Sequence, residues 1–314
     1  MEAKKPVYIH QSFRDSDLMT KSTLNWQYDT VYKLMPNALQ GENTALVFPS
    51  LQLSYAHRSG GILYTVTSPK GMLSVGIIER CDDKACFGET KLQKGDIVFF
   101  DDKKPNNLIT SGTFVTSIIG IPKKYHRQLA QRLALESGKV IRDTNSELST
   151  MLQEILSHFR QDPSLFDLPS TQVETEEKLI AKIEKLLEDQ TPYSPKLTKG
   201  ERIALQIRDR IYKRITKKVT ITSLAEEFGV SEQTLQNAFK SLFGMTPNKF
   251  LRNLKLNHVR KVLINASPEE ETIVHVANRW GFTHMGHFSR YYTDLFGENP
   301  SVTLQRRSGN IPST

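Results

Sequence analysis

The sequence is poor in cysteine and in long apolar segments. Its 314 residues include only two cysteines, Cys81 and Cys86, so a framework of disulfides is excluded. No apolar run approaches the ~20 residues that a membrane-spanning helix requires. The N-terminus, MEAKKPVYIHQSFRDSD, lacks the apolar core of a signal peptide. These absences predict a cytoplasmic protein without a membrane partner. Whether the two thiols form a redox pair or are incidental stays open.

Clustered metal ligands are also scarce. His10, His57 and His126 are dispersed, and no His-x-His motif occurs. His284 and His287 lie close together, but no cysteine or carboxylate nearby completes a metal site. We therefore expect neither a metal nor another cofactor.

What the chain does contain is an uneven distribution of charge. The net charge is +8, and residues 196–314 hold 19 Lys and Arg against 10 Asp and Glu. Residues 1–195 hold 23 against 24 and are nearly neutral. A basic domain joined to a neutral one suggests an anionic partner for one half, and nucleic acid is the usual one. Charge alone leaves an ordinary soluble basic domain open.

Strand-like and helix-like segments follow one another before the basic region. Short runs rich in β-branched and aromatic residues, separated by Gly and Pro, occupy residues 45–122 and predict a small barrel or sandwich. In one of them Leu51, Leu53, Tyr55 and His57 share a face at period two. Residues 123–190 then show apolar residues spaced three and four apart, which predicts helices. Residues 191–200, with two prolines, fit a linker.

Residues 229–247, GVSEQTLQNAFKSLFGMTP, have a near-copy at residues 281–300, GFTHMGHFSRYYTDLFGENP. The glycines that open the two copies are 52 positions apart, whereas the prolines that close them are 53 apart. The repeat therefore carries one inserted residue, near the start of the second helix of the later copy.

Each copy is typical of a helix-turn-helix. The first helix carries a small residue, Ala225 or Ala277, where two helices approach closely. Gly229 or Gly281 then ends it, because glycine adopts the left-handed conformation at little cost. One copy alone also fits an ordinary helical hairpin packed for stability. Two copies on a basic domain favour a helix that enters the major groove of DNA.

The second helix of each copy is amphipathic, and Ser231 or Thr283 is suited to cap its start. In the first copy, the residues expected to face a core are Leu235, Phe239, Leu242 and Phe243. Those expected to face outward are Glu232, Gln233, Gln236, Asn237 and Lys240.

These two units, the helix FLRNLKLNHVRKVLI between them and the Gly-Phe…His-Phe-Ser-Arg…Phe-Gly…Pro run resemble the DNA-binding domain of the AraC family of bacterial transcription regulators. The resemblance covers residues 201–304. It implies an all-α domain whose two recognition helices enter successive major grooves on one face of bent DNA.

The resemblance also implies which residues face the bases. The DNA-binding positions it implies are Gln233, Gln236, Asn237 and Lys240 in the first unit, and Met285, Gly286, Ser289 and Arg290 in the second. Asn237 stands where many relatives carry arginine, and Met285-Gly286 offers little hydrogen bonding. We therefore expect the first unit to read sequence, because Gln and Asn can bond adenine bidentately. The second unit would mainly position the protein, with Arg290 on phosphate or guanine.

The N-terminal half loosely resembles the cupin-like sensor domain of such regulators, and a metal-dependent cupin enzyme is disfavoured by the dispersed histidines. A pocket without metal is expected, in which Tyr55, His57, Arg58 and Tyr64 present polar groups to a ligand. Arg58 would favour an anionic ligand.

The chain as a whole is thus predicted to be multidomain α+β. Residues 1–122 would form a β-rich, cupin-like ligand-sensing barrel, 123–190 a helical region for dimerisation or connection, 191–200 the linker, and 201–314 the AraC-type DNA-binding domain. The resemblance implies a transcription regulator or activator that responds to a small effector and contacts RNA polymerase. The apolar stripes of residues 146–160 and 175–190 exceed what one barrel face must cover, and dimerising helices at this location are common in the family. We therefore expect a homodimer through one of these two segments.

Two other functions share features with this sequence. The first is a DNA-binding protein of architectural or partner-controlled type, which needs no ligand. The second is a DNA-repair methyltransferase carrying a similar helix-turn-helix. That enzyme needs a zinc-binding cysteine cluster and a Pro-Cys-His-Arg motif, and the sequence has neither. We therefore expect no enzymatic activity.

Overall fold

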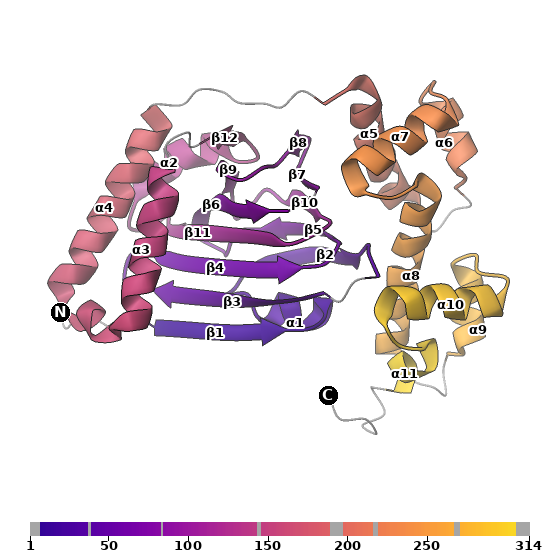
Figure 1. The fold of residues 1–314 in the computed structure, drawn as a ribbon, viewed down its shortest axis with the longest axis horizontal. Helices are drawn as coiled ribbons and strands as arrows, with labels where there is room; N and C mark the ends of the chain where they lie inside the picture. The colour runs from indigo at the N-terminus through magenta and orange to yellow at the C-terminus, as the bar shows by residue number, and fades with distance from the viewer. Residues whose placement is uncertain are drawn as a thin grey trace. The chain divides into compact units, whose positions relative to one another are not determined.

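The computed structural model describes residues 7–36, 39–82, 84–142, 146–188, 197–215, 219–266 and 271–305 (Figure 1). The chain divides into two compact units. Unit 1 comprises Met1–Val31, Leu39–Ser59 and Tyr64–Lys196, and unit 2 comprises Tyr32–Ala38, Gly60–Leu63 and Leu197–Thr314. Of the predicted linker 191–200, residues 191–196 lie outside the described residues.

Strands and a few helices make up the N-terminal part of the chain. The strands are β1 (Val7–Phe13), β2 (Gln27–Lys33), β3 (Gln40–Val47), β4 (Gln52–Ser59), β5 (Ile62–Thr67), β6 (Met72–Cys81), β7 (Ala85–Phe87), β8 (Thr90–Lys91), β9 (Asp96–Phe100), β10 (Asn106–Thr110), β11 (Phe114–Pro122) and β12 (Val140–Arg142). The helices are α1 (Ser16–Lys21), α2 (Arg127–Glu136), α3 (Glu147–Gln161), the 3-10 helix η1 (Pro163–Asp167) and α4 (Pro169–Glu188).

The strands form two sheets. The larger has seven strands in the order β1-β3-β4-β11-β6-β9-β12, and the smaller has five in the order β2-β5-β10-β7-β8. The described strands therefore do not close into the predicted cupin-like barrel. The alternation of residues along a strand defines its two faces. Closure of a barrel instead requires the two edge strands to hydrogen-bond to each other, and no local sequence pattern encodes that pairing.

Several element boundaries also differ from the prediction. At the start of the predicted β region, β3 and β4 are antiparallel and are joined by a tight turn, in which Phe48 N donates to Leu51 O at 2.9 Å. β1 and β2 precede the predicted β region, and their polar sequences, VYIHQSF and QYDTVYK, carry a weak apolar pattern. β12 lies inside the predicted helical region, where it pairs with β9.

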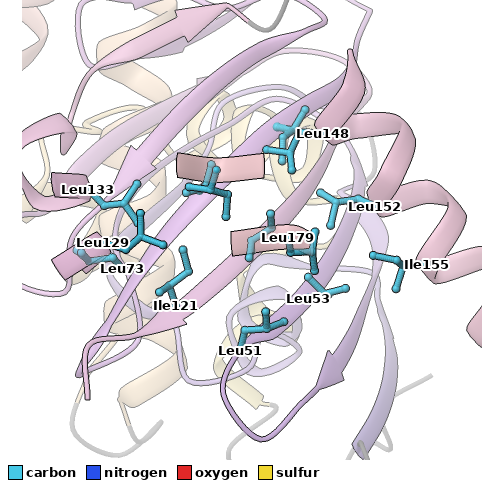
Figure 2. Packing of buried hydrophobic residues seen from close by; sticks show 14 of the residues in the cluster. Leu51, Leu53, Leu73, Ile121, Leu129, Leu133, Leu148, Leu152, Ile155 and Leu179 are labelled. Carbon is cyan, nitrogen blue, oxygen red and sulfur yellow. The ribbon is translucent and has the colours of Figure 1, made fainter. Parts of the chain in front are cut away.

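Helices cover one face of the larger sheet (Figure 1). Alternate residues of its strands point toward α2, α3 and α4 and form the main core of unit 1. Figure 2 shows this packing for Leu51, Leu53, Leu73, Ile121, Leu129, Leu133, Leu148, Leu152, Ile155 and Leu179. The apolar stripes of α3 and α4 are thus buried within the chain itself. The surplus of apolar surface that suggested dimerisation through these helices is therefore smaller than the sequence implied.

Helices alone form residues 197–305 as described. They are α5 (Lys199–Arg214), α6 (Ile221–Glu227), α7 (Glu232–Phe243), α8 (Pro247–Asn265), α9 (Ile273–Arg279), α10 (Met285–Phe296) and α11 (Pro300–Gln305). None of the helices in the described ranges has the length and apolar character needed to cross a bilayer.

Unit 2 includes a short segment from early in the sequence. Asn257 on α8 binds both backbone groups of Lys33: its Oδ1 accepts from Lys33 N at 2.8 Å, and its Nδ2 donates to Lys33 O at 2.8 Å. Asn253 Nδ2 donates to Leu34 O at 2.7 Å. Unit 2 is therefore completed by residues that a fragment beginning at residue 197 would lack.

The core beneath α4 can be tested by truncating Leu179, which is 0% exposed. Leu179→Ala should lower the free energy of unfolding of unit 1 by about 2–5 kcal/mol, because it removes buried methyl groups and leaves a cavity. Leu135→Ala, at a leucine that is 75% exposed, should change it by less than ~0.5 kcal/mol. Trp26 fluorescence during urea unfolding, in a Trp280→Phe background, reports the transition of unit 1. Equal effects of the two substitutions would show that α4 does not pack on the sheet.

Candidate functional site

The turn in each helix-turn-helix unit is built on the same backbone motif. After α6, Gly229 has φ +62°, Gly229 N donates to Glu226 O at 3.1 Å, and Val230 N donates to Ala225 O at 3.0 Å. These paired bonds form a Schellman motif, which satisfies the last carbonyls of the helix.

The second unit repeats this motif in detail. Gly281 has φ +86°, Gly281 N donates to Asn278 O at 2.9 Å, and Phe282 N donates to Ala277 O at 3.0 Å. Ala277 is fully buried, as the close approach of two helices requires. The left-handed glycines predicted from the sequence are confirmed at both turns.

The starts of the two recognition helices, α7 and α10, differ. Ser231 caps α7, and its Oγ accepts from Thr234 N at 3.1 Å. The prediction that Thr283 caps α10 is wrong: the N-cap is His284, without a side-chain cap bond. The inserted residue of the second copy moves the start of the helix one position beyond the threonine.

The outward face of α7 carries polar side chains. Gln233, Asn237 and Lys240 are exposed and Gln236 is half-buried. Gln233 Nε2 donates to Asn237 Oδ1 at 3.0 Å, one turn apart on this face. On the opposite face, the four residues predicted to face a core are buried, and Ala238 is buried beside them.

The outward face of α10 has a different character. Arg290 is exposed and Ser289 is half-buried, whereas Met285 packs against the core of the second unit. A Cβ built on Gly286 meets nothing within 4 Å, so this part of the helix surface is open. Two cation–π contacts that the sequence did not predict lie here. The guanidinium carbon of Arg252 on α8 is 3.9 Å from the ring centre of Tyr291, and that of Arg290 is 5.4 Å from it.

α8 joins the two units through their cores. Near its start, Phe250 stacks on Phe243 with ring centres 4.9 Å apart and contacts Phe239 edge-on. Toward its end, Leu256, Val259 and Leu263 belong to the core formed with α9 and α10. Both α7 and α10 therefore pack against the same helix, α8.

A buried polar network anchors the far end of α8. Arg260, which is buried, pairs with Glu298, and its Nη1 donates to Thr303 Oγ1 at 3.3 Å. Tyr292 OH donates to the same Thr303 Oγ1 at 2.8 Å. These bonds tie α8, α10 and α11 together, and loss of one charged partner would leave the other buried and uncompensated.

Unit 1 contains a cavity of about 250 Å³, lined by residues of both sheets. Arg58 and Tyr64, two of the predicted ligand-binding residues, line it. Arg58 Nη1 donates to Tyr64 OH at 2.8 Å. Tyr55 and His57 lie on the same strand as Arg58 with the opposite parity, so they face the helix-covered side of the sheet and do not line the cavity.

Other polar candidates lie apart from these two places. His284 and His287 stand edge to face on α10, with ring centres 6.2 Å apart. Cys81 is half-buried on β6 in the larger sheet, Cys86 is buried on β7 in the smaller one, and neither is in a disulfide.

Comparison with known proteins identifies the C-terminal region. A family model described as a helix-turn-helix domain matches residues 224–306, which include both copies of the repeat.

Curated relatives match part of the chain. The probable thc operon regulatory protein of Rhodococcus erythropolis is 33% identical over 113 residues, which is 36% of this chain and 34% of that protein. The XylDLEGF operon transcriptional activator of Pseudomonas putida is 34% identical over 96 residues, 31% of this chain and 30% of that protein. The chain thus spans about a third of the length of these relatives. Both are named as regulators of transcription.

A solved structure is similar to part of the chain. A probable AraC family transcriptional regulator from Rhodopseudomonas palustris is 34% identical, with a TM-score of 0.31. The match covers 33% of this chain and 96% of that one.

The turn geometry can be tested with two glycines of the second unit. Gly281→Ala should lower the free energy of unfolding of unit 2 by about 1–2 kcal/mol, because alanine is strained at positive φ. Gly286→Ala should raise it by up to about 1 kcal/mol, because glycine within a helix is entropically unfavourable. An added Cβ clashes with nothing at either position. The two substitutions therefore report the effect of backbone conformation on stability without a contribution from steric overlap.

Trp280 fluorescence in a Trp26→Phe background, followed during urea unfolding, reports unit 2. A stabilising Gly281→Ala would contradict the left-handed turn. A destabilising Gly286→Ala would show that this glycine has another structural role.

Proposed function

We propose that the chain is an AraC-type transcription regulator that binds specific DNA sequences through both helix-turn-helix units at once. The observation that carries this proposal is the repeated motif itself. Two recognition helices with exposed polar faces are held by one helix that is buried in both cores.

The length of α8 supports simultaneous binding in successive major grooves. Its 19 residues span about 28 Å at 1.5 Å per residue. Successive turns of one groove are about 34 Å apart. A bend of the DNA toward the protein shortens that separation on the bound face, which reconciles the two lengths.

In this proposal the first unit reads bases. The bond from Gln233 to Asn237 uses one donor and one acceptor, and leaves Gln233 Oε1 and a proton of Asn237 Nδ2 for an adenine edge. Gln236 and Lys240 flank the pair, with Lys240 placed for phosphate. The amide pair is therefore ordered before DNA arrives.

The second unit positions the protein on the backbone. Met285 offers an apolar contact, Gly286 offers no side chain, and Ser289 and Arg290 supply the polar groups of α10. Arg252, held against Tyr291, adds a second cation beside Arg290. Both suit phosphate oxygens, which carry no direct sequence information.

Unit 1 supplies the regulatory half of the proposal. A small effector in its cavity would alter DNA binding or contact with RNA polymerase, as in an activator. A homodimer is part of the proposal as well. Because the apolar stripes of α3 and α4 are buried in the core of unit 1, other residues would have to form the dimer interface. If the protein were instead an architectural DNA binder that needs no ligand, the cavity would have no role in its function.

One selection experiment tests the function. Purified full-length protein is incubated with sheared DNA from its own source, and the retained fragments are sequenced. The proposal predicts a few promoters that share a bipartite motif. Uniform retention across the genome would support the architectural binder instead.

Two substitutions test the division between the units. Gln233→Ala should reduce discrimination at one base pair by about 1–3 kcal/mol while leaving binding to unrelated DNA unchanged. Arg290→Ala should weaken binding to all sequences and lower the slope of log K against log salt by about one ion.

Gln305→Ala and Lys261→Ala, at an exposed glutamine on α11 and an exposed lysine on α8, serve as matched controls. Binding is measured by fluorescence anisotropy on the selected site and its single-base variants over a range of salt. If both test substitutions reduce affinity uniformly across sequences, the units do not divide the work in this way.

A further inference from the structure

The cavity of unit 1 contains a buried cation, Arg58, that forms no ion pair within the part of the chain that the structure describes. Arg58 is 5% exposed, and among the described residues its side chain is hydrogen-bonded only to the hydroxyl of Tyr64. Its Nε is buried and has no hydrogen-bond partner. Since a buried charge is normally paired, this guanidinium is arranged for a group that comes from outside the chain.

No residue around the cavity supplies the missing anion. Among its lining residues, all of them described, there is neither Asp nor Glu, and Lys21 adds a second basic side chain. Burial raises the pKa of Tyr64 far above its ordinary value, despite the opposing effect of Arg58. The phenol therefore stays neutral and donates or accepts hydrogen bonds only.

A second polar atom is left unsatisfied on the same wall. Thr116 Oγ1 is buried without a hydrogen-bond partner, and Thr116 lines the cavity. It lies on β11, whose Phe114 pairs with Arg58 of β4, two residues away. Residues two apart on a strand share a face, so the hydroxyl and the guanidinium face the cavity from neighbouring strands.

The remaining walls are mostly apolar. Trp26, Phe100 and Phe114 contribute aromatic surface, and Trp26 meets Phe100 edge to face at 5.1 Å. Val66, Val98, Leu108 and Ile118 add aliphatic surface. At about 250 Å³ the cavity suits a compact molecule, near the lower end of ligand-binding cavities.

We propose that this cavity binds a small organic monocarboxylate, with its carboxylate on Arg58 and Thr116 and an aromatic ring or branched chain against the apolar walls. The inference rests on the proposed function for its regulatory meaning, because it names the chemical class of the effector. A planar carboxylate accepts two parallel hydrogen bonds from one edge of a guanidinium, and its single negative charge neutralises the single positive charge of the buried arginine. Thr116 is a positioning and specificity residue that the sequence pattern did not single out.

The chain offers a built-in reporter for this site. It has two tryptophans, and only Trp26 lines the cavity. Full-length protein with Trp280→Phe is titrated with 3-phenylpropanoate, phenylacetate, benzoate and 4-methylpentanoate, while Trp26 emission and melting temperature are followed. At least one carboxylate should bind saturably and raise the melting temperature.

The matched alcohol and amine of that acid should bind at least ~10-fold more weakly, since each loses a charge-assisted hydrogen bond. Inorganic phosphate alone should not shift the emission, because it has no apolar body. If the alcohol binds as tightly as the acid, or if phosphate competes with it, the site does not recognise a carboxylate. If none of the four acids binds below 1 mM ligand (roughly 4 kcal/mol of binding energy), the inference is overturned.

Substitutions separate recognition from folding. Arg58→Met should weaken binding of the acid at least ~10-fold, yet melt no lower than the parent without ligand, because it removes an uncompensated buried charge. Thr116→Val should weaken binding several-fold without loss of stability.

Thr110→Val is the matched control for Thr116, because Thr110 also carries a buried hydroxyl without a partner but does not line the cavity. It should leave affinity unchanged. If Arg58→Met instead lowers the melting temperature and leaves affinity unchanged, the arginine is structural and the proposal fails. Retention of genomic DNA by the unliganded protein tests the proposed function separately from every one of these outcomes.

Discussion

The burial of one helix in two separate cores is the constraint on which the DNA-binding unit depends. α8 contributes Phe250 to an aromatic cluster with α7, and Leu256, Val259 and Leu263 to the core around α10. A helix with apolar residues on most of its sides has no free face along which to slide or rotate. The separation and relative rotation of α7 and α10 are therefore fixed within unit 2, so in the proposed complex the binding of two half-sites of DNA would cost little conformational entropy.

In unit 1, strand alternation produces two surfaces with different roles. One face of the larger sheet is sealed by α2, α3 and α4, while the other faces the smaller sheet and the cavity. The same alternation separates Tyr55 and His57 from Arg58, although the three are neighbours in the sequence.

Local patterns predicted the DNA-binding unit well because its signals are local. The glycines that end α6 and α9, the small alanines before them and the amphipathic face of α7 all act within a few residues, and the structure confirms them. The N-cap of α10 was mispredicted because one inserted residue shifts the helix start to His284. Long-range features were not predictable in this way. Nothing near Asn257 in the sequence indicates that it binds the backbone of Lys33, and nothing near Thr116 indicates that it faces Arg58 across a strand pair.

The fixed spacing of the two recognition helices is the central claim, and changing the spacing of their half-sites tests it most directly. Five base pairs are inserted between the two halves of a selected site, which rotates one half by about half a turn of B-DNA. Affinity for the full-length protein is then compared with that for the parent site and for a site with one half scrambled. The account predicts that the insertion weakens binding as much as scrambling one half does. Unchanged affinity would mean that the units reorient independently and that α8 does not set their spacing.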